Sequence, residues 1–137
     1  MHIQKLSDTP KEKASHEYDM SMLYKQVLFC WDRREKEIRG RLSMFNFAVL
    51  KPSGYFTQYM HGSNDPEIGM TEIFFISKGN ALFKIDDQEH EVSNNTLVIV
   101  DRGEVHSMKN LSDTENLEYF VFGISSGGKT TVVKNTY

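Results

Sequence analysis

Residues 95–110 read Asn-Thr-Leu-Val-Ile-Val-Asp-Arg-Gly-Glu-Val-His-Ser-Met-Lys-Asn, and this stretch decides the fold. It contains two strand-like runs, 97–100 and 105–109, separated by a segment that carries Asp101 and Gly103. Short runs bounded by Gly, Asn and Asp are typical of strands joined by a tight turn. The stretch therefore predicts two strands, with His106 near the start of the second.

The same pattern continues on both sides of this stretch. The expected strands are 22–29, 42–51, 56–61, 72–77, 81–85, 90–92, 97–100, 105–109 and 117–123. No stretch of twelve or more residues keeps a helical period. Residues 78–80 and 85–89 are expected to form tight turns, because Gly, Asn and Asp tolerate the positive φ that hairpins need. Short strands at even spacing predict an all-β sandwich or barrel.

Several polar and glycine residues follow a spacing of their own. Glu72 is followed by six residues and a glycine, and Asn95 opens the run Asn-x5-Asp-x-Gly-x2-His-x3-Asn. This spacing resembles the two motifs of the cupin superfamily, G-x5-H-x-H-x3,4-E-x6-G and G-x5-P-x-G-x2-H-x3-N. The positions that correspond are Tyr59, His61, Glu72, Gly79, Asn95, Asp101, Gly103, His106 and Asn110. The resemblance extends over residues 42–123.

The chain departs from the family pattern in three ways. Tyr59 replaces the first histidine of the H-x-H pair, and the segment 62–71 is longer than the usual spacer before the glutamate. Asn95 and Asp101 stand where the second motif has Gly and Pro. Asn is an accepted substitute for Gly where the backbone is left-handed.

The resemblance implies a double-stranded β-helix, the jelly-roll barrel of small single-domain cupins. We expect an N-terminal arm over residues 1–20, either loose or tied to a neighbouring subunit, a barrel over 21–124, and a C-terminal tail over 125–137 whose Val-rich end pairs with a sheet edge or a partner chain. Small cupins of this kind usually dimerise by exchanging terminal strands, so a homodimer is expected. Trp31, Phe47, Phe74, Phe83 and Phe120 are interpreted as core residues.

A metal site is predicted on His61, Glu72 and His106. Period-two alternation puts Tyr59 and His61 on one face of one strand, and Glu72 opens the next, so a carboxylate can meet two imidazoles inside a barrel. Two His and one carboxylate leave coordination positions open, as iron, manganese, nickel or catalytic zinc requires. The competing interpretation is two hydrogen-bonded core histidines and a glutamate paired with Lys or Arg.

Two further residues, Tyr59 and Glu67, are candidates for handling a proton. Tyr59 is open to three interpretations: a phenol directed at the metal, a hydrogen-bond donor to substrate, or a wall residue. Glu67, like Asp65, lies in the long segment 62–71 and is either a replacement ligand or an ordinary solvated acid. The glycines near the ends of this segment favour a mobile flap over the metal.

Composition excludes several classes of function. The net charge is −3 with both signs interspersed, so we expect no nucleic-acid partner. Cys30 is the only cysteine, which fits a reducing, cytoplasmic setting. The apolar runs are too short to span a bilayer, and the N-terminus has no apolar core of a signal peptide.

Function does not follow from this fold, since cupins host many activities. The leading hypothesis is a metal-dependent enzyme that acts on a small polar molecule, of dioxygenase, isomerase, lyase or cyclase type. The alternative is a non-catalytic module that binds or senses a small molecule. The metal content of the purified protein discriminates between them.

Overall fold

The computed structural model describes residues 6–14, 19–30, 42–61, 70–101, 103–125 and 132–134. A 3₁₀ turn, η1 (Leu6–Asp8), precedes the strands. They are β1 (Lys11–Lys13), β2 (Leu23–Cys30), β3 (Leu42–Leu50), β4 (Tyr55–His61), β5 (Met70–Lys78), β6 (Asn80–Ile85), β7 (Gln88–Ser93), β8 (Thr96–Val100), β9 (His106–Asn110), β10 (Leu117–Ser125) and β11 (Val132–Lys134). Among these described residues, no helix is long and apolar enough to cross a membrane.

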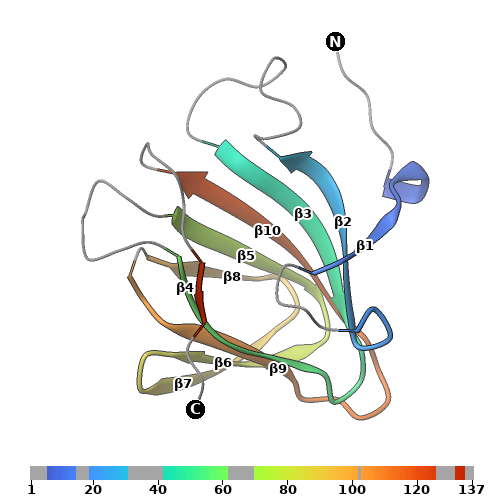
Figure 1. Cartoon of the computed structure of the whole chain (residues 1–137). Helices are drawn as coiled ribbons and strands as arrows, with labels where there is room; N and C mark the ends of the chain where they lie inside the picture. Colours follow the sequence, from blue (N-terminus) through green and yellow to red (C-terminus); the bar gives the residue numbers. More distant parts are fainter. Residues whose placement is uncertain are drawn as a thin grey trace.

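The strands form two antiparallel sheets that face each other (Figure 1). The larger sheet has six strands in the order β1-β2-β3-β10-β5-β8, and the smaller has five in the order β11-β4-β9-β6-β7. Strands distant in sequence are neighbours, since β10 pairs with both β3 and β5. This is the all-β jelly-roll barrel that the strand pattern and the motif spacing predicted.

Alternation along the strands separates the barrel interior from its outside. On β5 the buried residues are every second one, Met70, Glu72, Phe74 and Ile76. β9 repeats the pattern with His106, Met108 and Asn110. The apolar members pack into one core between the sheets. Its buried residues are Leu23, Ala48, Leu50, Phe56, Phe74, Ile76, Ala81, Phe83, Val100, Met108, Leu117, Tyr119 and Val121.

The predicted turns have the backbone that their residues favour. Gly79 (φ 104°) joins β5 to β6, and Asp86 (φ 50°) lies in the turn between β6 and β7. Asn95 has φ 61°, so the residue that replaces the motif glycine adopts the left-handed conformation that Asn tolerates. Gly103 (φ 82°) lies in the turn before β9.

Asn110 anchors the end of β9 to the rest of the barrel. Its Nδ2 donates to the carbonyl oxygens of Leu50, Lys51 and Glu115 at 3.1, 3.1 and 2.8 Å. Its Oδ1 accepts the backbone N–H of Ser112 at 2.9 Å. A single buried amide thus satisfies backbone groups from two separate turns, which is a physical reason for Asn at this motif position.

Both terminal segments pair within the chain. β1 is antiparallel to β2, and Gln26 Nε2 donates to the carbonyl oxygens of Leu6 and Thr9 at 2.8 and 2.7 Å. The described part of the N-terminal segment is therefore held by the chain's own barrel, which differs from the arm, loose or tied to a neighbouring subunit, that the sequence predicts. At the other end, β11 pairs with β4 at a sheet edge, as predicted for the Val-rich end.

The outer face of the larger sheet carries two apolar rows that cross β3, β10, β5 and β8. Their members are Phe47, Phe120, Phe75 and Leu97 in one row and Phe45, Phe122, Ile73 and Ile99 in the other. Phe45 and Phe122 are stacked with ring centroids 4.3 Å apart. Phe47 and Phe120 are thus half-buried on this outer face, which corrects their prediction as core. Phe74 and Phe83 are core residues, and Trp31 lies outside the described residues.

Candidate metal and ligand site

A cavity of about 80 Å³ lies inside the barrel, against the inner face of the larger sheet. Most of its wall is apolar and comes from the core. Five of its lining side chains are polar or charged: Lys25, Asn46, Glu72, His106 and Tyr119. A mostly apolar cavity with a few converging polar groups is the usual form of a small-molecule site.

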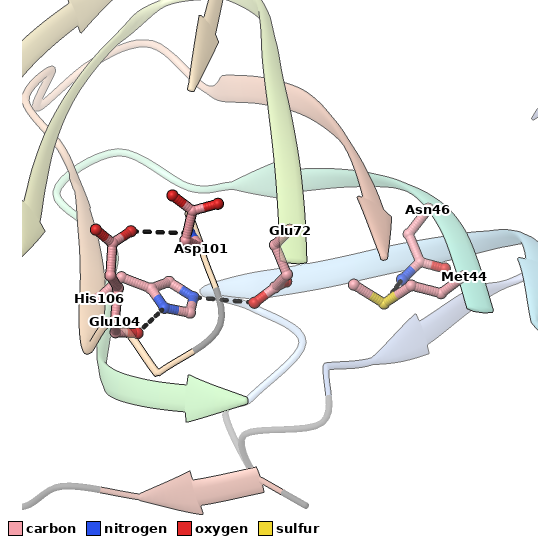
Figure 2. Close-up of polar contacts among 6 residues, drawn as sticks. All are labelled: Met44, Asn46, Glu72, Asp101, Glu104 and His106. Atoms are coloured by element: carbon pink, nitrogen blue, oxygen red, sulfur yellow. Dashed lines mark hydrogen bonds and ion pairs between the residues drawn. The ribbon is translucent and has the colours of Figure 1, made fainter. Parts of the chain in front are cut away.

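Glu72 and His106 face each other across this cavity. Glu72 Oε1 and His106 Nε2 are 3.1 Å apart, and the two residues are only 5% and 2% exposed (Figure 2). The rings of Phe56 and Phe74 lie in T-shaped contact with the imidazole, with centroids at 6.0 and 5.8 Å. A carboxylate in such apolar surroundings requires a proton or a cation beside it. A proton between the two atoms or a bound cation would each meet this requirement, and the Lys25 ammonium group lines the same cavity.

The backbone around His106 is held by the turns next to it. Asp86 N donates to the Val105 carbonyl at 2.7 Å, and Asp86 Oδ1 accepts the Val105 N–H at 3.0 Å. In the turn before β9, Asp101 N donates to Glu104 Oε2 at 2.8 Å. His106 Nδ1 lies 3.5 Å from the Glu104 carbonyl oxygen (Figure 2). A proton on Nδ1 directed at that oxygen leaves the Nε2 lone pair toward Glu72, which is the tautomer a metal ligand needs.

The structure describes the other predicted site residues only in part. Tyr59 of β4 pairs with His106 of β9, and His61 of β4 pairs with Val132 of β11, so the backbone of the H-x-H segment runs beside the site. The side chains of Tyr59 and His61 lie outside what the structure describes, as do Glu67 and residues 62–69 of the flap predicted over 62–71. The last two residues of that prediction, Met70 and Thr71, belong instead to β5. Within the described part of the chain, no group of three or more His, Cys, Asp or Glu side chains is placed to hold a metal.

Tyr119 is a buried phenol in the same cavity, on β10 between β3 and β5. Burial raises the pKa of Tyr119 well above its usual value, and the nearby Glu72 carboxylate raises it further. The phenol therefore stays protonated and acts as a neutral donor at any physiological pH.

Asn46 and Tyr119 were not identified from the sequence. Asn46 is the lone polar residue in the run Phe-Asn-Phe-Ala-Val-Leu. This pattern could have indicated a site residue, because a buried amide in an apolar strand needs a hydrogen-bond partner. The sequence around Tyr119 contains no comparable indication of a site residue, since aromatic residues are common in strands. Glu72 and His106, which the motif spacing identified, do face each other in the barrel.

The family comparison agrees with this architecture. The sequence pattern of the family described as "Cupin domain" matches residues 48–123, more than half of the chain, and the chain belongs to this family. A search of curated proteins returned no significant match.

Many solved structures share the fold. A sugar phosphate isomerase of the cupin superfamily from Silicibacter pomeroyi has a TM-score of 0.74 at 15% identity, covering 99% of this chain and 83% of its own. The polyketide cyclase RemF from Streptomyces resistomycificus has 0.73 at 13%, with coverages of 100% and 86%. A predicted oxalate decarboxylase from Thermotoga maritima has 0.71 at 19%, with coverages of 90% and 99%. At these identities the likeness establishes the fold alone.

Proposed function

We propose that this cupin is a metal-dependent enzyme that acts on a small polar molecule inside the barrel, with His61, Glu72 and His106 as the metal ligands. The observation that supports this most is the buried carboxylate and imidazole facing each other at 3.1 Å in a cavity. The donor types fit a divalent iron, manganese, nickel or zinc ion.

Stability alone does not account for this pair. Burying a carboxylate is costly, and replacing even a buried ion pair by apolar residues is often neutral or stabilising, by about 1–4 kcal/mol. The other buried residues of β5, Met70, Phe74 and Ile76, are apolar, and an aliphatic residue at position 72 would continue that row. A carboxylate retained there at a cost supports a role in binding.

A divalent metal bound here would supply Lewis-acid or oxygen-activating chemistry. The chain's own residues then have distinct roles. Glu72 contributes negative charge, Phe56 and Phe74 keep bulk water from the imidazole, and the protonated Tyr119 donates a hydrogen bond to a substrate oxygen. Tyr59 and Glu67 remain the proposed proton-handling groups from the sequence.

The reaction type stays open within this proposal. The three similar structures described above carry the names of an isomerase, a cyclase and a predicted decarboxylase, so the fold is compatible with different chemistries. The polar side chains in the cavity and its small size favour a compact polar substrate.

Metal analysis tests the proposal. Protein purified without chelator should contain about one divalent ion per chain by mass spectrometry, and Glu72→Gln and His106→Gln should each lower metal retention against a competing chelator at least tenfold. His90→Gln is the matched control, because His90 is exposed on β7. Circular dichroism should show that all three variants stay folded.

Two outcomes would contradict the proposal. Full metal retention by Glu72→Gln would remove the carboxylate from the site. Metal-free wild-type protein that takes up none of the four metals and still binds small molecules would favour the alternative function, a non-catalytic binding module.

A further inference from the structure

The inner face of the larger sheet carries a second polar group whose role the metal site does not explain. Asn46 of β3 lines the cavity and is 6% exposed. Its Nδ2 lies 3.6 Å from Met44 Sδ, a weak acceptor (Figure 2). Its Oδ1 is buried without a hydrogen-bond partner among the described residues. Exchanging the oxygen and nitrogen of the Asn46 amide would not give the oxygen a partner, because it would then face the Met44 thioether sulfur, which has no proton to donate.

Asn46 is a polar residue in a row of apolar residues. Its cross-strand partners are Val27 on β2 and Val121 on β10, and Val121 in turn pairs with Phe74 on β5. An aliphatic side chain would continue this row into the core. An orphaned buried amide destabilises a fold, so its presence in an apolar row indicates a partner from outside the described residues.

The register connects Asn46 to the Glu72 site. One row further along, Gly123 of β10 lies between Met44 of β3 and Glu72 of β5. The glycine has no side chain, so no β10 side chain separates those of Met44 and Glu72 on the inner face at this level. Because neighbouring strands are about 4.8 Å apart, β3 and β5 are separated by about 10 Å. A small molecule placed beside Glu72 and His106 can therefore extend toward the Asn46 amide.

We propose that Asn46 is a specificity-determining residue, whose Oδ1 accepts a hydrogen bond from a hydroxyl group on a small molecule bound in the cavity. The ligand class is a hydroxyl-bearing small molecule, with the hydroxyl distant from the end that meets Glu72 and His106. This inference rests on the proposed ligand cavity, but not on the presence of a metal. A site built to hydrogen-bond a hydroxyl rejects the analogue that lacks it, because its own polar group is then left unpaired.

The first test measures stability without ligand. Asn46→Leu should raise the melting temperature by roughly 3–8 °C, because it removes an unsatisfied buried amide. Asn110→Leu is the matched control, since Asn110 is the buried asparagine whose hydrogen bonds are all made within the chain, and it should lower the melting temperature. A fall for Asn46→Leu as large as for Asn110→Leu would overturn the proposal, because the amide would then be structural.

The second test measures recognition directly. Ligand-observed NMR would compare the pairs glycolate and acetate, lactate and propionate, and glycerol and 1,3-propanediol on the full chain. Wild-type protein should prefer the hydroxylated member of at least one pair. Asn46→Leu should reduce that ratio of affinities about tenfold, because it removes one hydrogen bond to the ligand hydroxyl. No preference in the wild type, or an unchanged preference in Asn46→Leu, would overturn the proposal.

Metal content separates this inference from the proposed enzyme function. Asn46→Leu should retain as much metal as wild type, whereas Glu72→Gln should not. If wild type takes up no metal but its hydroxyl preference depends on Asn46, the metal proposal fails and this inference stands. If metal binds as proposed, but Asn46→Leu neither raises the melting temperature nor alters the preference for hydroxylated ligands, this inference fails while the metal proposal stands.

Discussion

Replacing Asn110 by alanine should destabilise the barrel severely without touching the cavity. The side chain is 1% exposed and makes its hydrogen bonds to backbone groups of residues 50, 51, 112 and 115. Alanine offers none of these partners and leaves the carbonyl oxygens and the Ser112 N–H where water has little access.

The magnitude follows from this set of partners. The two Nδ2 hydrogens serve three carbonyls, so the amide supplies the equivalent of two donors and one acceptor. Each lost bond costs about 0.5–1.5 kcal/mol, and a backbone group left buried and unpaired costs about 1–3 kcal/mol. Partial access of water to the turns reduces the total, and we expect a loss of about 3–5 kcal/mol in the free energy of unfolding.

Urea denaturation followed by circular dichroism measures this loss. With a urea m-value of about 2 kcal/mol/M for a domain of this size, the midpoint should fall by about 1.5–2.5 M. Ser112→Ala is the control, because it keeps its backbone N–H and loses only exposed hydroxyl contacts to Thr114 and Glu115. Its cost should be below about 1 kcal/mol. A midpoint for Asn110→Ala within about 0.5 M of wild type, one quarter of the expected shift, would refute the reasoning.

Further predictions concern turns and assembly. Gly79→Ala should lower the free energy of unfolding, measured by urea denaturation, by about 2–4 kcal/mol, because φ is 104° and the added Cβ lies 3.0 Å from a backbone carbonyl oxygen. Gly103→Ala, with φ 82° and open space around it, should cost only about 1 kcal/mol. Equal losses would contradict the steric argument. Asn95→Val should lose about 1–3 kcal/mol in the same assay and Asn95→Gly less than about 1 kcal/mol, since φ is 61°, and a stable valine variant would be inconsistent with the left-handed backbone. The homodimer stays a prediction, and because the described terminal strands pair within the chain, the apolar outer face is the surface we expect it to bury. The double variant Leu97→Lys and Ile99→Lys, at side chains 55% and 51% exposed in the single chain, should therefore sediment as a folded monomer while wild type sediments as a dimer. A monomeric wild type would show that this expectation is wrong.

Much of the site could be predicted from spacing, because local chemistry sets it. Gly79, Gly103 and Asn95 stand where the backbone has positive φ, a requirement that only a few residue types meet. Glu72 and His106 were identified by their distance from these turns, and they face each other in the barrel. The metal itself, His61 as its third ligand, and the roles of Tyr59 and Glu67 stay predictions.

The sequence by itself determined where most of the barrel strands and turns lie, since alternation and turn chemistry act over a few residues, but it did not indicate β1. Only the tertiary structure decided which face of β3 is inside, because both faces carry apolar residues: Phe45 and Phe47 lie on one, and Met44 and Ala48, with the polar Asn46 between them, on the other. A period of two tells which residues share a face, but not which face the fold buries. That choice depends on β10 inserting between β3 and β5, a pairing between segments far apart in the chain. It turns Asn46 inward beside the Glu72 site and leaves the phenylalanines on the outer surface.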